Sequence, residues 1–214
     1  LFGSDVTTSI YKNKNGNLWF GSYSGGAALV TKDKTLIYKP KTGVPYFLIS
    51  AVYEDSKGKV WFCTGEGGVA CMTPDGYVCY TSKQGLTSNK ITCITEDSQK
   101  NIWIGTHDGG INRIKPNSFR NYSSLDGISD KGVSSLYVNR KGHVLIGTWG
   151  AGIYAFNGTY FASLGGNPNP RSAIVMSMAE DSNGNLYHGV HQGGVQKFTP
   201  NDNDSAGYDS IIAL

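Results

Sequence analysis

The sequence predicts an all-β protein, a β-propeller or propeller segment of five four-stranded antiparallel blades. The first observation is a strict 42-residue repeat in a chain of 214 residues. Each copy carries one large aromatic or aliphatic residue at the same position, which we call the slot. The slot holds Trp19, Trp61, Trp103, Leu145 and Tyr187. The second observation is a pair of small residues in the same register, at 25–26, 67–68, 109–110, 151–152 and 193–194. Such a fixed period indicates one supersecondary unit copied five times.

The third repeat shows the expected strands of one blade, at 91–95, 102–104, 111–114 and 119–122. These short segments are rich in β-branched and aromatic residues, which is typical of strands. Segment 102–104 is apolar at three consecutive positions, so both faces of the sheet should be buried against neighbouring copies. A β-helix solenoid is the alternative, although its turns are usually shorter. Helical repeats are excluded because no copy carries an apolar period of 3.6 residues.

The blades are expected at about 1–42, 43–84, 85–126, 127–168 and 169–214 of a single domain. The chain starts and stops at nearly the same phase of the repeat, which we interpret as a piece of a longer array. Residues 208–214 should form a shifted fourth strand of the last blade or the start of another element. The first strand of each blade carries a small residue where inner strands crowd together, namely Ser9, Ala51, Cys93, Ser135 and Ser177.

Composition excludes several classes of function. The net charge is only +3, and no basic run is interleaved with aromatic residues, so nucleic-acid binding is not expected. No apolar stretch reaches the length of a membrane span. The four cysteines lack paired CxxC spacing, so neither a metal site nor a cofactor is expected. Cys71 and Cys79 flank the turn at 74–76 symmetrically and could form a cross-strand disulfide; buried free thiols are the alternative.

A candidate binding surface is predicted at one end of the blades. Antiparallel alternation puts the turns between second and third strands on the same side as the connectors between blades. Those turns vary in chemistry from copy to copy, and their residues are Tyr23, Glu66, His107, Asp108, Trp149, His191 and Gln192. Aromatic, acidic and imidazole groups around one mouth suit a carbohydrate or another small polar ligand. The alternative is that exposed turns vary without function. The connectors would add Pro45, Tyr46, Asn89, Asp130 and 169–171.

The turns at the other end are monotonous. Asp55, Asp97 and Asp181 each precede a Gly or Lys by three residues, and we expect these carboxylates to bind their own turn backbone rather than calcium. His188 occupies a column otherwise filled by Phe and Ile, which indicates a buried neutral histidine. His143 lies in a turn and is expected to be solvated.

The repeat resembles a known family. Segments 94–97, 101–106 and 109–113, with the connector at 85–91, closely resemble the two-component regulator propeller repeat, and the resemblance covers essentially the whole chain. It implies the periplasmic input module of a membrane-anchored hybrid histidine kinase that recognises oligosaccharides, with the remaining blades or signalling domains of the parent chain as partners. The family normally builds seven blades, whereas five copies are present here.

Two other functions compete with non-catalytic sensing. Streptogramin lyases resemble this repeat, and Glu66, His107 and His191 could supply an acid–base set if they converged on one cavity. No nucleophile elbow, metal-ligand spacing or phosphate loop supports catalysis, so no catalytic residue is assigned. A protein-interaction scaffold is the third possibility, and it would show a contiguous apolar patch on one face.

Overall fold

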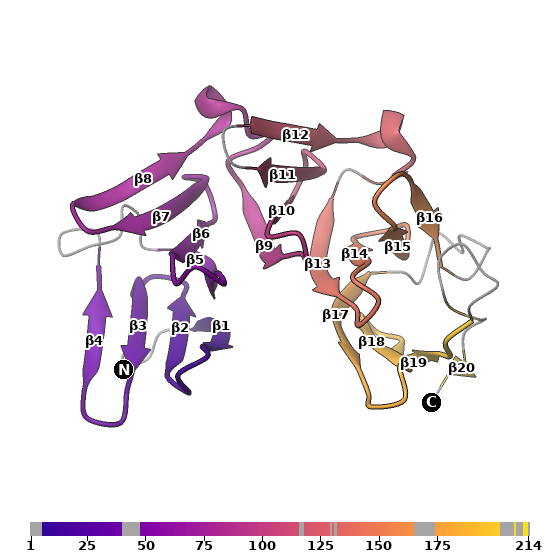
Figure 1. Ribbon diagram of the computed structural model, residues 1–214, viewed down its shortest axis with the longest axis horizontal. Helices are drawn as coiled ribbons and strands as arrows, with labels where there is room; N and C mark the ends of the chain where they lie inside the picture. The colour runs from indigo at the N-terminus through magenta and orange to yellow at the C-terminus, as the bar shows by residue number, and fades with distance from the viewer. Residues whose placement is uncertain are drawn as a thin grey trace. The chain divides into compact units, whose positions relative to one another are not determined.

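The computed structural model describes residues 6–39, 48–115, 118–128, 130, 132–164, 174–201, 208 and 212–213. Its strands form five four-stranded antiparallel sheets, each with its strands in chain order (Figure 1). The predicted all-β propeller fold of five blades is therefore confirmed. The chain divides into two compact units, Leu1–Ile94 and Thr95–Leu214, and each is described by itself.

The first unit contains two complete blades. The strands of the first blade are β1 (Thr7–Lys12), β2 (Leu18–Ser22), β3 (Ala27–Val30) and β4 (Thr35–Tyr38). Those of the second are β5 (Ile49–Glu54), β6 (Val60–Thr64), β7 (Val69–Thr73) and β8 (Gly76–Tyr80). The unit boundary falls within β9 (Ile91–Glu96), the first strand of the third blade.

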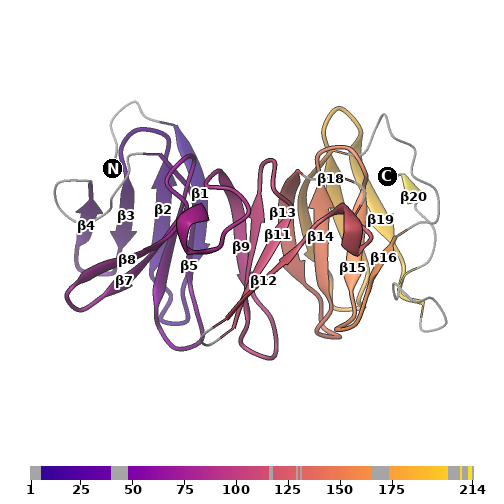
Figure 2. The same cartoon turned by 90° about the horizontal axis from the view of Figure 1, so that it is seen from above.

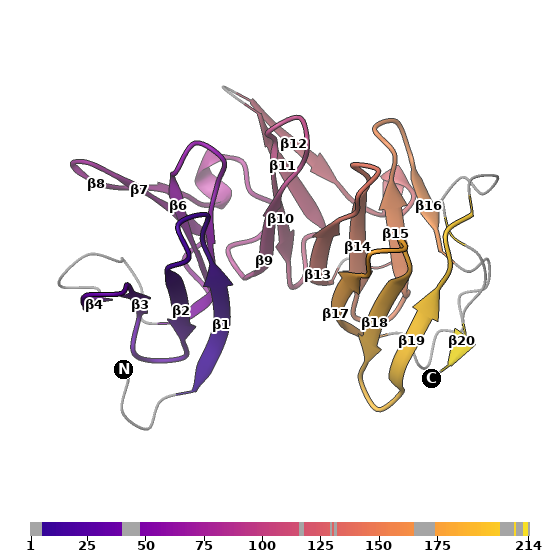
Figure 3. The same cartoon turned by 60° about the horizontal axis from the view of Figure 1, so that its bottom comes forward.

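The second unit holds the remaining strands. The third blade continues with β10 (Ile102–Thr106), β11 (Ile111–Lys115) and β12 (Ser118–Tyr122). The fourth blade has β13 (Val133–Val138), β14 (Val144–Thr148), β15 (Ile153–Phe156) and β16 (Phe161–Ser163). The fifth has β17 (Val175–Glu180), β18 (Leu186–Val190), β19 (Gly194–Phe198) and β20 (Ile212–Ala213). Figure 3 shows the strand order within the first and last blades.

The end of the last blade and the connectors between blades add detail to the sequence prediction. Strand β20 pairs with β19 through Lys197 and Ile212, so the last segment does form the shifted fourth strand. The connectors after the second and third blades each contain a three-residue 3-10 turn, η1 (Ser82–Gln84) and η2 (Ser124–Asp126). Thr81 and Ser123 cap the two turns with their side-chain oxygens.

The large slot residue packs against the same strand in three blades, as the repeat requires. Each indole contacts a tyrosine of its own fourth strand, with centroids 5.3 Å apart for Trp19 and Tyr38, 5.8 Å for Trp61 and Tyr80, and 5.5 Å for Trp103 and Tyr122. All five residues of β6, β10 and β14 are buried, which confirms that the second strand is covered on both faces.

Apolar side chains fill the space between neighbouring blades within each unit. In the first unit, Trp19 and Ile49 belong to one buried cluster that joins the first and second blades. In the second unit, Leu145, Val175 and Phe198 belong to a cluster that joins the fourth and fifth blades, whose sheets lie against each other in Figure 2. Burial of two faces per sheet is the dominant stabilising contribution to such a fold.

The inner strands are held together by small residues and hydroxyl groups. A Cβ added at Gly147 would lie 2.3 Å from Ser135 Oγ and 2.8 Å from Val175 Cγ1, so this position must stay small. The register shifts just before Ser135, and the hydroxyl of Ser134 donates to the carbonyl of Val175 in the next blade at 2.5 Å. Ser50 makes the same bond to Ile91 at 2.6 Å. The predicted small-residue column therefore serves close packing of adjacent blades.

Of the two alternatives for Cys71 and Cys79, the structure excludes the cross-strand disulfide and supports free thiols. The hairpin β7–β8 pairs Cys71 with Val78 and Cys79 with Ala70, so the two cysteines are not opposite each other. The tight turn uses only two central residues, whereas the symmetric reading required three. Successive side chains alternate between faces of a strand, so this one-residue slip sends the two sulfur atoms to opposite faces. All four cysteines are free thiols, and burial raises the pKa of Cys63.

Candidate functional site

The turns after the second strands share one hydrogen-bonded frame in four blades. The hydroxyl of Thr106 donates to the carbonyl of Gly110 at 2.8 Å and accepts the N–H of Gly109 at 3.0 Å. Ser22, Thr64 and Thr148 do the same in their blades. Because the frame is constant, the residues between its ends can vary without loss of the turn.

The fifth blade departs from this frame. Val190 replaces the hydroxyl residue and cannot make either bond. Its carbonyl instead accepts the N–H of Gly193 at 3.0 Å, and Gln192 takes a left-handed φ of 57°. The exposed side chains of His191 and Gln192 are therefore presented by a differently shaped turn from those of the other blades.

The blade connectors do lie beside these turns, as predicted. The backbone N–H of Tyr23 donates to Val6 at 2.9 Å in the first unit, and that of His191 donates to Ile174 at 2.9 Å in the second. Gly68 N–H donates to the carbonyl of Asn89, also at 2.9 Å. Side chains from turns and connectors can therefore act on one ligand within each unit.

The structure brings His107 and Trp149 together. Their ring centroids lie 5.9 Å apart and the planes are tilted by 48°. Gly132 of the connector fits between the two turns: its carbonyl accepts the N–H of Trp149 at 3.1 Å, and a Cβ on it would meet Trp149 Cδ1 at 2.5 Å and the His107 carbonyl at 2.8 Å. Asp130 accepts the Gly132 N–H at 2.9 Å. An exposed indole, an exposed imidazole and a carboxylate thus occur within one small surface.

The other predicted residues occupy the corresponding turns of their own blades. Tyr23 is 62 % exposed and Glu66 is exposed in the first unit, while Asp108, His191 and Gln192 are exposed in the second. Pro45, Tyr46 and 169–171 lie outside the described residues. The binding role of the whole set stays a prediction.

At the opposite end of the blades, the aspartates serve their own turns. Asp97 Oδ1 accepts the backbone N–H groups of Gln99 and Asn101, both at 2.9 Å. Its Oδ2 accepts Trp103 Nε1 at 2.7 Å and Asn101 Nδ2 at 2.8 Å. Asp55 binds its own turn and Trp61 in the same way. The expected binding of these carboxylates to their own turn backbone is confirmed. Their hydrogen bonds to the slot tryptophans were not predicted.

The prediction holds for His188 but not for His143. His188 is 4 % exposed and stacks on Phe198 with centroids 5.2 Å apart, and burial lowers its pKa. The expected buried neutral histidine is therefore supported. His143 is a correction, because it is only partly exposed, its Nδ1 is buried without a partner, and burial lowers its pKa, with Lys141 contributing. The turn of the third blade at Ser98 lies against this turn, a contact between blades that no local sequence pattern indicates.

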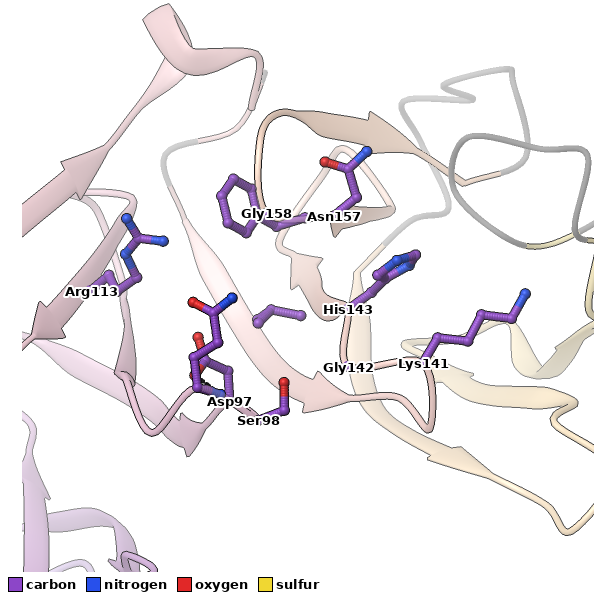
Figure 4. Close-up of a pocket in the computed structure, with 11 residues that line it drawn as sticks. Asp97, Ser98, Arg113, Lys141, Gly142, His143, Asn157 and Gly158 are labelled. Atoms are coloured by element: carbon purple, nitrogen blue, oxygen red, sulfur yellow. Dashed lines mark hydrogen bonds between the residues drawn. The ribbon is translucent and has the colours of Figure 1, made fainter.

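A pocket that the sequence did not predict lies beside His143. It has a volume of about 210 Å³ and opens between the turns of the third and fourth blades (Figure 4). Neither His107 nor Trp149 lines it. Arg113 from β11 and Phe156 from β15 form part of its wall, together with Asn157. Among the described residues, no group of three or more His, Cys, Asp or Glu side chains is arranged to hold a metal ion.

Comparison with known families supports the predicted resemblance. The model of the two component regulator propeller family matches residues 1–24 and 85–108, which fall in the first and third repeats. These segments contain the Trp19 and Trp103 slots. No curated protein matches the chain. Two of the five repeats thus match the two-component regulator propeller repeat, as the resemblance predicted.

Solved structures with the same fold include extracellular domains of two component systems and lyases. The extracellular domain of BT3049 from B. thetaiotaomicron, described as a candidate hybrid two component system, is 25 % identical, with a TM-score of 0.76 over 92 % of this chain and 28 % of that one. The extracellular domain of BT4673 from B. thetaiotaomicron is 21 % identical, with a TM-score of 0.77 over 98 % of this chain and 31 % of that one. A catalytically inactive virginiamycin B lyase from Staphylococcus aureus, with quinupristin, is 17 % identical, with a TM-score of 0.76 over 98 % of this chain and 70 % of that one.

The chain spans less than a third of the length of the first two of these proteins. It resembles parts of these extracellular domains, and lyases share the same fold. Within the described residues, no helix is both long enough and apolar enough to span a membrane.

Proposed function

We propose that this chain is a non-catalytic, ligand-sensing part of a periplasmic propeller, which serves as the input module of a membrane-anchored hybrid two-component sensor. Its ligand is an oligosaccharide, bound at the turns that hold Tyr23, Glu66, His107, Asp108, Trp149, His191 and Gln192. Remaining blades or signalling domains of the parent chain are its partners. The family match and the fold shared with extracellular sensor domains support this proposal.

The observation that carries the proposal is the group formed by His107, Trp149 and Asp130. Trp149 is 38 % exposed, whereas the other three tryptophans are at most 5 % exposed, so this indole alone is available to a ligand. An aromatic face packs against the C–H surface of a sugar ring, while carboxylate and imidazole groups bind hydroxyls. The unique exposure also makes Trp149 a fluorescence reporter for binding.

The test is calorimetric titration of the protein with a panel of neutral oligosaccharides, alongside tryptophan fluorescence. We expect one saturable ligand whose binding shifts the Trp149 emission and is lost in the double variant Trp149→Ala, His107→Ala. Tyr160→Ala is the matched control, because Tyr160 is a 49 % exposed aromatic residue in the turn between β15 and β16, at the other end of the blade. Binding that survives the double variant would refute this site.

The lyase alternative makes an opposite prediction. It requires Glu66, His107 and His191 to act together on one substrate, and it draws support from the fold shared with virginiamycin B lyase. Incubation with quinupristin, followed by mass spectrometry, separates the two. A sensor leaves the compound intact. Product formation that disappears with His107→Ala would favour the lyase and contradict the sensor.

A further inference from the structure

Arg113 departs from the repeat at a buried position between two blades. The equivalent residues of the first, second and fourth blades are Leu29, Cys71 and Ala155, which pair with the slot residue in the same register. Arg113 pairs with Trp103 and is only 7 % exposed. The fifth blade carries Lys197 at this position, but that side chain is only partly buried. In the third blade a permanently charged side chain is therefore buried where three other blades carry an apolar one, and burial of a charge is costly unless it is compensated.

Aromatic rings compensate part of this cost. The guanidinium carbon lies 5.3 Å from the ring centroid of Trp103, 5.4 Å from Tyr122 and 5.8 Å from Phe156. Such cation–π contacts favour the charge, by about 2 kcal/mol when desolvated, but they supply no acceptor for the N–H groups. Nε of Arg113 is buried and has no hydrogen-bond partner, and the hydroxyl of Tyr122 is in the same condition.

No carboxylate of the described residues is bonded to Arg113. Asp97 also lines the pocket, but both of its oxygens are occupied by the turn backbone, Trp103 and Asn101. The acidic group is therefore committed to the fold, and the positive charge of Arg113 has no bonded anionic partner within the part of the chain that the structure describes. An arginine that lines an open pocket with its Nε buried and unpartnered indicates that an external acceptor belongs there.

We propose that the pocket between the third and fourth blades binds a small oxyanion, the carboxylate or phosphate group of a ligand, through Arg113. The planar fork of the guanidinium matches the two oxygens of either group, and the flanking rings of Trp103 and Phe156 hold it in one orientation. Figure 4 shows Arg113 entering from β11 on one side, with Asn157 on the other. This site lies at the opposite end of the blades from Trp149.

The rest of the wall agrees with an anionic occupant. Asn157 Oδ1 accepts the N–H groups of Thr159 and Tyr160, so its side-chain amide can only donate toward a ligand. Lys141 adds a second positive charge at the rim. The volume of about 210 Å³ is below the roughly 300–1,000 Å³ typical of sites for drug-sized molecules, which limits the occupant to a small molecule or one terminal group.

The experiment titrates the protein with sodium phosphate, sodium acetate and sodium benzoate at constant ionic strength, with sodium chloride as the reference salt. Binding is followed by calorimetry and by the ¹⁵Nε–H NMR resonance of Arg113, which should be slow to exchange because the atom is buried. The proposal expects saturable binding of at least one oxyanion with a shift of that resonance. Comparison of the affinity for phosphate with those for the two carboxylates then shows which group the site prefers. Comparison of the affinities for benzoate and acetate measures the contribution of the aromatic side chains that flank the site.

Two variants make the result specific. Arg113→Lys keeps the charge but removes the fork, and it should weaken binding about tenfold or more. Arg120→Gln is the matched control: this exposed arginine on β12 pairs with Arg113 across the sheet and does not line the pocket, so its loss should leave affinity unchanged. The double variant Trp149→Ala, His107→Ala should also bind the oxyanion normally, which separates this site from the proposed sensing surface.

Several results would overturn the proposal. Only non-saturable responses equal to those of chloride would show that Arg113 acts solely as an inter-blade contact. Unchanged affinity in Arg113→Lys, or equal weakening by Arg120→Gln, would show that binding reflects general surface charge. Arg113→Leu imitates the first blade and serves as a second test, because a folded variant that still binds the anion excludes this residue.

Discussion

The tie between the first turn of a blade and its slot residue can be tested with Asp97→Asn. Asp97 is 8 % exposed and accepts four hydrogen bonds, two at each carboxylate oxygen. Asparagine retains the oxygen that accepts the backbone N–H groups of the turn. It replaces the other oxygen with an NH₂ group, which cannot accept from Trp103 Nε1 or Asn101 Nδ2.

The expected loss follows from the two donors that are left without an acceptor. Trp103 is fully buried and Asn101 is 5 % exposed, so water cannot readily replace the missing oxygen. An orphaned buried donor costs about 1–3 kcal/mol, so Asp97→Asn should lower the free energy of unfolding by about 2–5 kcal/mol. The first blade already shows this situation, because Asn13 occupies the equivalent position and Trp19 Nε1 has no partner.

Urea unfolding followed by circular dichroism at pH 7 provides the measurement. Asp33→Asn is the control, since Asp33 is exposed in a turn of the first blade and its change should stay within about 0.5 kcal/mol. In a Trp103→Phe background, Asp97→Asn should cost about 1 kcal/mol less, because one of its two donors is already gone. A loss below about 1 kcal/mol, or strict additivity of the two substitutions, would refute the reasoning.

Three further predictions concern single positions. Lys100 has a left-handed φ of 67° where the other four blades have glycine, so Lys100→Gly should raise the free energy of unfolding by about 0.5–1 kcal/mol in thermal or urea unfolding; no gain would contradict this. Burial lowers the pKa of His188 and His143, so the unfolded chain binds protons more readily and the free energy of unfolding should fall as pH drops below about 6.5. His188→Phe should make the free energy of unfolding depend less on pH between pH 7 and 5. An unchanged pH dependence would disprove the role of His188. Gly132→Ala forces Trp149 to move, which should shift its fluorescence and cost about 1–3 kcal/mol, whereas wild-type emission would show that the connector does not set the indole.

The repeat made most of the fold predictable. In the third blade, the expected segment 102–104 lies inside β10 and 119–122 lies inside β12, with ends extended by one or two residues. These positions were readable because apolar runs, turn residues and glycines recur at fixed intervals, so five copies reinforce one pattern. The hairpin β7–β8 was less predictable, since a turn of two or three central residues fits the same sequence and only the pairing of strands decides between them.

The candidate site was predictable in outline but not in its contacts. Chain alternation alone placed Trp149 beside a blade connector, and the structure confirms this neighbour. That His107 reaches the same indole depends on Gly132, whose missing side chain lets two turns approach. The environment of Arg113 was not readable at all, because Phe156 belongs to the next blade and no local pattern announces that contact.

Departures from the repeat explain why several buried polar atoms lack partners, but they do not all carry function. Trp19 Nε1 is orphaned because Asn13 replaces an aspartate, and the indole is packed in an apolar cluster. His188 replaces an apolar residue and stacks on Phe198 in the same closed manner. Both groups are packed against apolar or aromatic side chains, so we expect the cost of the missing partner to fall on stability. Arg113 combines the same kind of departure with an open pocket and a full charge. That combination, rather than the missing partner alone, is what distinguishes a binding group from drift within a packed column.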